Sequence, residues 1–256
     1  MKFKVAHIIM ILLIAFGVVL AFLNLISFWM IIGVAVGYLI FLLVISTNVR
    51  LNFFVRAHNA NPIVGDRSIA ITFDDGPVEN TKEILSILKK YDVKASFFCI
   101  GQHIENNPEI FQLLIEDGHF IGNHSYSHTR KMGFLSSKDI VKEIKACDAI
   151  IYKIAGINSR TFRPPFGVIN PNTQKALVET GHVVVGWNVR SYDAVLSSSN
   201  FVLRRILRKI KPGDVILLHD NNLKTVHILE QLLIFLKDNN YTPVRVDTLF
   251  NIDAYN

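Results

Sequence analysis

Two adjacent carboxylates stand at the end of a short apolar run. The run Ser68–Phe73 leads directly into Asp74 and Asp75, which are followed by a Gly-Pro turn. Like charges side by side repel, so a compensating positive charge is expected nearby. A divalent metal ion supplies one if one carboxylate is a ligand and the other stays free as a base. The alternative is an exposed turn that caps the helix beginning near Thr81, and the pair alone does not decide between them.

Two histidines follow another apolar run. His124 and His128 come after Phe120–Asn123 and are four residues apart, so they can reach one ion from a helical turn or a folded loop. One carboxylate and two imidazoles form an open metal set, which leaves positions for water and substrate and suits zinc, cobalt, nickel or ferrous iron. Histidine pairs also occur by chance, but this position at a strand end strengthens the metal interpretation.

Three more polar residues lie near the ends of later apolar runs. Arg163 precedes two prolines, which stiffen its loop, and an arginine beside a catalytic carboxylate would keep that carboxylate ionised. His219 becomes a general acid if a carboxylate raises its pKa, and Asp193 is the candidate. The alternatives are a surface arginine in a Pro-rich turn and a structural histidine. Six other histidines are expected to be structural or surface residues: His7, His58, His103, His119, His182 and His227.

Strand-like and helix-like segments alternate along residues 68–250. The expected strands are 68–73, 95–100, 120–123, 161–162, 183–187, 215–218 and 242–246, and the expected helices are 81–91, 108–117, 137–155, 171–180, 200–210 and 223–238. This alternation predicts an α/β fold with a largely parallel sheet. About seven strands suggest a barrel short of eight, although an open sheet is also compatible. Either architecture gathers the active site at the carboxyl ends of the strands.

The first 57 residues are predicted to be a membrane anchor, followed by a connector over 58–67 and a catalytic domain over 68–250. Two apolar segments, about 5–23 and 25–45, are each about long enough to cross a bilayer at ~20 residues per helix. A signal peptide is the alternative for the first segment. Both ends of such a hairpin are basic, which favours a cytoplasmic domain. A single crossing, with the second segment re-entering the membrane, would favour the outside.

The charge distribution argues against nucleic acid as a partner. Of the net charge of +6, four charges come from the first 60 residues, where Lys2, Lys4, Arg50 and Arg56 flank the apolar segments without any acid. The two cysteines, Cys99 and Cys147, lack the close spacing of a zinc or redox site and are expected to be free, buried thiols.

Taken together, these segments resemble the NodB-homology polysaccharide deacetylases, carbohydrate esterase family 4. Five motifs occur in the family's order: Thr-Phe-Asp-Asp-Gly-Pro at 72–77, His-Ser-x-x-His at 124–128, Arg-Pro-Pro-Phe-Gly at 163–167, the stretch 187–193, and Leu-Leu-His-Asp at 217–220. The resemblance covers about 68–250 and implies a distorted (β/α) barrel, in agreement with the alternation of elements.

The resemblance also implies a role for each candidate residue. It makes Asp74 the general base and His219 the general acid, with Arg163 orienting the base and Asp193 tuning the acid. The implied ligands of one divalent ion, most of all zinc, are Asp75, His124 and His128. The implied walls of the substrate pocket are Phe166, Trp187 and Leu217. Ala194 stands where the family commonly has tryptophan, which leaves the sugar-contacting wall and the identity of the substrate open.

The implied function is metal-dependent hydrolysis of N-acetyl, or O-acetyl, groups on a glycan such as peptidoglycan, a chitin-like oligomer or an exopolysaccharide. The implied partners are this glycan and the lipid bilayer, with neither nucleic acid nor a protein partner indicated, and the domain is expected outside the cytoplasm. A glycosidase is a poorer fit, since its two carboxyl groups lie at least ~5 Å apart on either side of a sugar. A membrane-anchored carbohydrate-binding protein without catalysis is the other alternative, and acetate release distinguishes it.

Overall fold

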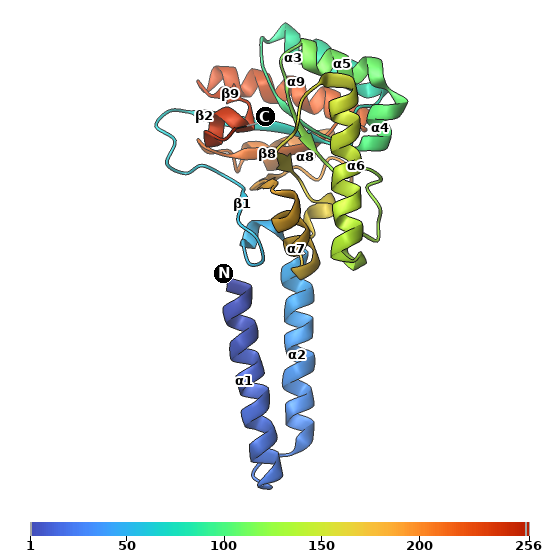
Figure 1. The fold of residues 1–256 in the computed structure, drawn as a ribbon. Helices are drawn as coiled ribbons and strands as arrows, with labels where there is room; N and C mark the ends of the chain where they lie inside the picture. The colour runs from blue at the N-terminus through green and yellow to red at the C-terminus, as the bar shows by residue number, and fades with distance from the viewer. Residues whose placement is uncertain (1, 254, 256) are drawn as a thin grey trace.

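The structure is a computed structural model that describes residues 2–253 and Tyr255 of the 256-residue chain. It has two parts, a long helical hairpin at the N-terminal end and an α/β body that holds the rest of the chain (Figure 1). The body is built on one curled sheet with helices around it. The sheet determines where the polar residues identified above come together.

The sheet has nine strands, all of whose ladders are parallel. The strands are β1 (Ala57–His58), β2 (Ser68–Asp74), β3 (Ser96–Cys99), β4 (Phe120–Asn123), β5 (Thr161–Phe162), β6 (Val183–Val185), β7 (Val189–Arg190), β8 (Val215–His219) and β9 (Thr242–Val244). Their order is β1-β6-β5-β4-β3-β2-β8-β7, with β9 beside β2. β1 and β7 stand at the two ends of this order, so the curled sheet is an open half-barrel and not a closed barrel.

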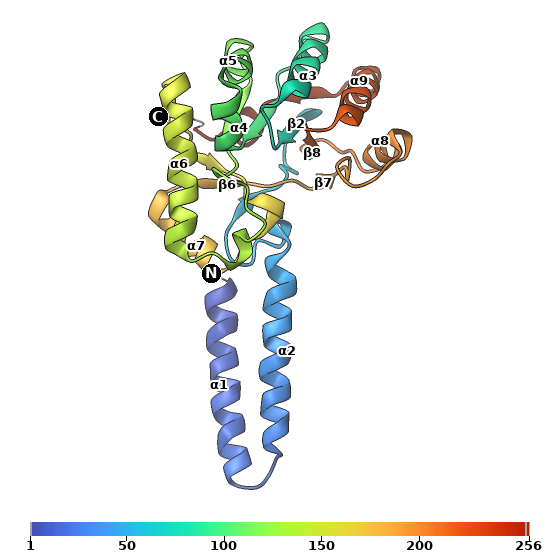
Figure 2. The ribbon, with the colours of Figure 1, turned by 90° about the vertical axis from the view of Figure 1, so that its right-hand side faces the viewer.

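Helices cover the outside of this sheet, and Figure 2 shows α6, α5, α3, α9 and α8 fanned around it. The helices of the body are α3 (Glu79–Lys90), α4 (Gly101–Asn106), α5 (Pro108–Glu116), α6 (Ser137–Ala155), α7 (Pro171–Thr180), α8 (Ser199–Leu207), α9 (Leu223–Asp238) and α10 (Val246–Phe250). The Ser136 side chain caps the start of α6, and Gly156, with a φ of 69°, ends it. Three short 3-10 helices complete the chain: η1 (Val49–Leu51), η2 (Met132–Phe134) and η3 (Pro165–Gly167).

The prediction of an α/β fold with a distorted (β/α) barrel of parallel strands is confirmed, and the barrel is a curled half-barrel with more strands than the expected seven or so. All seven expected strands are present, and two more, β1 and β7, have only two residues each. Such short strands carry no periodicity that a sequence pattern could reveal. β1 lies in the region expected to be anchor and connector, yet it pairs with β6. The short helices α4 and α10 also went unpredicted.

The hairpin consists of α1 (Lys2–Phe22) and α2 (Phe28–Ser46), which run side by side. Both are long and apolar enough to cross a membrane, and their side chains are almost entirely unburied. By length and composition the two helices suit membrane spans, and a signal sequence near the N-terminus has the same features. The N-terminal end of α1 lies at the same end of the hairpin as the α/β body.

The hairpin is joined tightly to the body. Ile169 donates a backbone hydrogen bond to the Ser46 carbonyl at the end of α2, at 2.8 Å. Just beyond, Val49 and Phe54 are each 3% exposed and belong to the same buried cluster as Trp187. The end of α2 therefore packs on one wall of the half-barrel.

Candidate active site

The carboxyl ends of β2 and β8 bring two of the candidate residues next to each other. In this parallel pair Asp74 is in register with His219, the last residue of β8. β2 is buried along its whole length, as expected for a strand covered on both faces. The polar residues therefore appear only where the strands leave the core.

Asp75, His124 and His128 form a group that could hold a metal ion, with one ligand atom of each within 4.8 Å of the others. Asp75 Oδ1 lies 3.6 Å from His124 Nε2 and 3.4 Å from His128 Nε2. Asn221 donates a hydrogen bond to the other oxygen, Asp75 Oδ2, at 3.0 Å. One carboxylate oxygen therefore faces the two imidazoles while the other is held from behind.

Neighbouring groups set the orientation and protonation of the two imidazoles. His124 Nδ1 lies 2.7 Å from the Arg163 carbonyl oxygen, which accepts a hydrogen bond from that nitrogen and leaves Nε2 free to face Asp75. Burial, together with the neighbouring His124, lowers the pKa of His128 to about 4, despite the opposing charge of Asp75. A neutral imidazole with one free nitrogen is the form that binds a metal, and a hydrogen bond on the other nitrogen fixes its tautomer.

Arg163 is completely buried and holds Asp74 by an ion pair of 2.7 Å from Nη1 to Oδ1. Three further guanidinium hydrogens are donated to Thr72 Oγ1 and to the backbone carbonyls of Val185 and Gly186. Burial lowers the pKa of Arg163, and the adjacent Asp74 carboxylate opposes this shift. Asp74 Oδ2 lies 3.7 Å from His124 Nε2, so the second oxygen of Asp74 faces the metal-binding group.

The buried Asp193 and the half-buried His219 form a second pair. His219 Nδ1 donates to Asp193 Oδ1 at 2.8 Å, and Asp193 also accepts hydrogen bonds from the hydroxyls of Ser191 and Thr225. Burial opposes protonation of the ring, but the Asp193 hydrogen bond and charge outweigh it and raise the pKa of His219 to about 9. Burial acts to raise the pKa of Asp193, but the hydrogen bond and charge of His219, together with the hydrogen bonds from Ser191 and Thr225, lower it.

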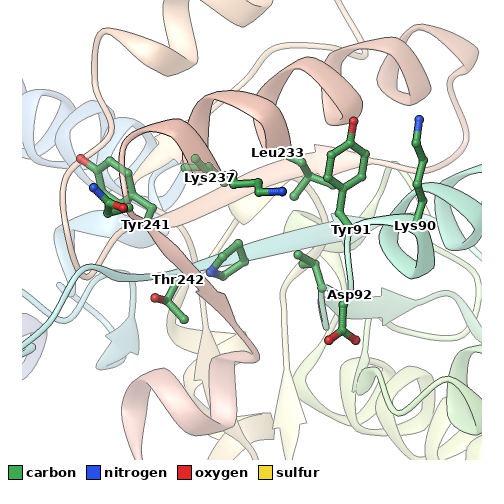
Figure 3. Close-up of a pocket in the computed structure, with 11 residues that line it drawn as sticks. Lys90, Tyr91, Asp92, Leu233, Lys237, Tyr241 and Thr242 are labelled. Atoms are coloured by element: carbon green, nitrogen blue, oxygen red, sulfur yellow. The ribbon is translucent and has the colours of Figure 1, made fainter.

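A cavity of about 220 Å³ opens between these groups. Its lining residues are Asp74, Asp75, His124, His128, Phe166, Trp187, Arg190, Tyr192, Ala194, Val195, Leu217 and His219. The structure thus brings together all the residues predicted from sequence except Arg163 and Asp193, which lie behind Asp74 and His219. A wider cavity of about 700 Å³ near the ends of α3 and α9 is lined by Tyr91, Lys237 and Tyr241 among others, and it contains no histidine (Figure 3).

Several residues of the site were missed by sequence reasoning. Asp220 is 1% exposed, and burial raises its pKa to about 7 although Thr81 donates a hydrogen bond to its Oδ2 at 2.7 Å. Its carboxylate occupies the space where a side chain on Gly76 would lie. The position of Asp220 beside His219 was the only available signal, whereas Arg190 and Tyr192 lie on the short β7 and the loop after it.

Two histidines outside the site have structural contacts, as expected. His103 Nδ1 contacts the backbone carbonyl of Asp75. His119 is buried and accepts a hydrogen bond from the Ala95 N–H on Nδ1, and burial lowers its pKa to about 4. Both cysteines are free and buried.

Comparison with known proteins agrees with this geometry. The family model described as "Polysaccharide deacetylase" matches residues 62–185. The chain is 30% identical over 186 residues to the peptidoglycan-N-acetylglucosamine deacetylase PgdA of Listeria monocytogenes, covering 72% of this chain and 39% of that protein. It is 32% identical over 187 residues to a peptidoglycan-N-acetylglucosamine deacetylase of Bacillus cereus, covering 69% of this chain and 68% of that protein.

Solved structures give the same result. The structure of the Bc1960 peptidoglycan N-acetylglucosamine deacetylase matches with a TM-score of 0.73 at 30% identity, covering 77% of this chain and 94% of that chain. This chain belongs to the polysaccharide deacetylase family, carbohydrate esterase family 4. It spans about two fifths of the length of the Listeria relative.

Proposed function

We propose that this protein is a metal-dependent hydrolase that removes acetyl groups from the amines of an N-acetylated glycan. The observation that carries the proposal is the convergence of Asp75, His124 and His128 within 4.8 Å of one another, beside the buried Asp74 and the half-buried His219. Membership of the polysaccharide deacetylase family supports the same reaction.

The three proposed ligands suit one divalent ion, and zinc fits a set of one carboxylate and two imidazoles well. Hydrogen bonds hold His124 Nδ1 and Asp75 Oδ2, so His124 Nε2 and Asp75 Oδ1 stay available as ligand atoms. Burial lowers the pKa of His128, which favours the neutral ring that can bind a metal. The bound ion supplies Lewis-acid polarisation of the acetamide carbonyl and of the attacking water.

The residues around this group divide the proton transfers between them. Asp74 Oδ1 is occupied by Arg163, so Oδ2 is the oxygen that takes a proton from the attacking water. The hydrogen bond from the Arg163 guanidinium fixes the direction of the Asp74 carboxylate. Because Asp74 must stay free to act as the base, the metal ligand is its neighbour Asp75.

His219 supplies the proton that the leaving sugar amine requires. Its Nδ1 is bound to Asp193, so Nε2 is the donor, and a pKa of about 9 keeps the ring protonated at neutral pH. Trp187 and Leu217, which are 5% and 2% exposed, form the buried apolar walls for the acetyl methyl group, with the more exposed Phe166 at the rim.

Acetate release from defined glycans tests the reaction. We expect the full-length chain, purified in detergent with one equivalent of zinc, to release acetate from N-acetylated peptidoglycan strands or chitin oligomers and to leave a free amine on the sugar. A chelator should stop the release and added zinc should restore it. Glycan binding without any acetate from either substrate would instead support the non-catalytic alternative.

We also propose that α1 and α2 form a membrane-spanning hairpin. The 19 residues of α2 are about 28 Å long at ~1.5 Å per residue, close to the ~30 Å of a bilayer core. Beyond it, Val49 packs near Gly167 and Gly186 behind the Trp187 wall, so the site would lie close to the membrane surface. We place the catalytic unit at 57–250, because β1 belongs to its sheet.

The side of the membrane follows from the substrate. The named relatives are peptidoglycan deacetylases, and peptidoglycan lies outside the cytoplasmic membrane, so we propose an extracytoplasmic domain despite the basic ends of the hairpin. Alkaline phosphatase, which is active only outside the cytoplasm, fused to the C-terminus of the full chain should be active. Activity of a cytoplasmic reporter at that position alone would contradict this topology.

A further inference from the structure

The active-site cavity is lined by one charged side chain, Arg190, to which the proposed reaction gives no role. Arg190, at the end of β7, lines the cavity together with Tyr192. Its guanidinium carbon lies 4.8 Å from the centre of the Tyr192 ring and 6.0 Å from that of the Trp187 ring. Hydrolysis of a neutral acetamide needs no such cation at the cavity wall.

A second arginine lies against the same tyrosine. The guanidinium carbon of Arg205, on α8, is 4.5 Å from the centre of the Tyr192 ring, and Arg205 Nε donates a hydrogen bond to the Arg190 carbonyl at 3.4 Å. Tyr192 itself has a φ of 65°, which is uncommon for a large side chain and often marks a functional site. Two guanidinium groups therefore lie against one aromatic ring that lines the cavity.

In the part of the chain that the structure describes, no ion pair within 4.0 Å includes Arg190 or Arg205. The sequence has no acidic residue between Asp193 and Asp214. This contrasts with the buried Arg163, which has a carboxylate partner.

The positive charge continues away from the cavity along α8. A shallow cavity of about 330 Å³ is lined by Phe201, Arg204, Arg205, Arg208 and Lys209. Arg204 and Arg205 lie in the last turn of α8, Arg208 is its C-cap and Lys209 follows it, so four basic side chains gather at the C-terminal end of this helix. An extended anionic chain that enters the active-site cavity past Arg190 and Arg205 could continue along these cations.

We propose that Arg190 and Arg205, held by Tyr192, bind an anionic group on the glycan, so that the substrate is an acidic N-acetylated glycan. The proposal rests on the deacetylase function proposed above and specifies its substrate class. A guanidinium binds the two oxygens of a carboxylate or a phosphate through paired hydrogen bonds. Because Arg190 also lies near Trp187, the anionic group belongs to the sugar that loses its acetyl group or to the next one along.

A set of matched oligomers tests the proposal and separates the two sources of charge. The substrates are the neutral chitin pentamer, a derivative with carboxylates and a derivative with phosphates, all N-acetylated. We expect the full-length chain in detergent, loaded with zinc, to have at least a ~10-fold higher kcat/KM for one of the charged pentamers than for the neutral one, since hydrogen bonds between charged groups are strong. Added salt should reduce this preference.

Two variants identify the residues responsible. Arg190→Gln and Arg205→Gln should each lower the preference for the charged pentamer by about 10-fold, mainly through KM, if one charge-assisted contact is lost. Arg160→Gln is the matched control, because Arg160 is an exposed arginine beside the start of β5, outside the cavity, and it should keep the preference of the unmodified chain.

A calorimetric measurement of how tightly each pentamer binds to the Asp74→Asn variant makes the result independent of turnover. Tighter binding of a charged pentamer that weakens with Arg190→Gln supports the anionic site even if no acetate is released, and absent acetate then counts against the deacetylase function alone. Equal binding and equal kcat/KM for the neutral and charged pentamers would overturn the proposal. So would an unchanged preference in both arginine variants.

Discussion

Replacing Asp193 with asparagine should move the alkaline limit of activity to lower pH. A general acid must carry its proton, so kcat falls as the pH rises through the pKa of His219. That pKa is about 9, against an ordinary value of 6.5, because the Asp193 hydrogen bond and charge outweigh burial. At 1.36 kcal/mol per unit the difference corresponds to about 3 kcal/mol in favour of the protonated ring.

Asp193→Asn keeps an oxygen that can accept from His219 Nδ1 but removes the negative charge. If the pKa returns to about 6.5, the protonated fraction at pH 8 falls from about 0.9 to about 0.03, which is about a 30-fold loss of kcat. Near pH 5.5 both proteins should be mostly protonated and should differ little. A bound divalent ion would lower the pKa of His219 in both proteins, so both profiles would shift to lower pH and remain separated.

The assay is the pH dependence of kcat for acetate release from a saturating N-acetylated oligomer, between about pH 5 and pH 10. Asp117→Asn is a matched control, since Asp117 is a carboxylate outside the cavity whose ion pair, with Lys89, spans 3.9 Å. It should keep the profile of the unmodified chain. The same loss of kcat for Asp193→Asn at every pH would refute the assigned role, because it would mean that Asp193 only supports the local structure.

Three further substitutions test separate parts of the site. Arg163→Ala should leave Asp74 buried without its partner, lowering stability by about 3–5 kcal/mol in denaturant unfolding and lowering kcat as well. Gly76→Ala would place a methyl group 1.9 Å from Asp220 Oδ2 and should cost about 1–3 kcal/mol in the same experiment. His219→Ala should keep its metal by elemental analysis and should be least impaired on an activated acetyl ester, whose leaving group needs no proton.

The candidate catalytic residues could be predicted because their positions follow from a simple rule. Parallel strands that alternate with helices align their carboxyl ends, so Asp74 and His219, which end separate strands, lie in register although 145 residues separate them in the sequence. The prolines after Arg163 indicated a fixed direction for that side chain, and the structure places it against Asp74. Residue type and a position at the end of a strand were therefore enough to predict these catalytic residues.

The part of the cavity wall formed by Arg190 and Tyr192 could not be predicted in the same way. β7 has two residues, too few for a periodic pattern, and the loop after it carries Tyr192 at a φ of 65°. Phe166 has a φ of 60°, and neither aromatic residue is a type that signals this conformation. The pairing of Arg190 and Arg205 around one ring depends on how α8 packs beside β7, so it appeared only in three dimensions.

The division of roles between Asp74 and Asp75 is tested most directly by measuring metal content and acetate release together in two variants. Asp74→Asn should keep about one equivalent of metal and lose at least ~10²-fold in kcat, the usual scale for loss of a general base. Asp75→Asn should lose metal and activity together and should recover partly as the metal concentration rises. Loss of metal in Asp74→Asn with retention of both metal and activity in Asp75→Asn would exchange the two roles, and full activity in both variants would contradict the whole site.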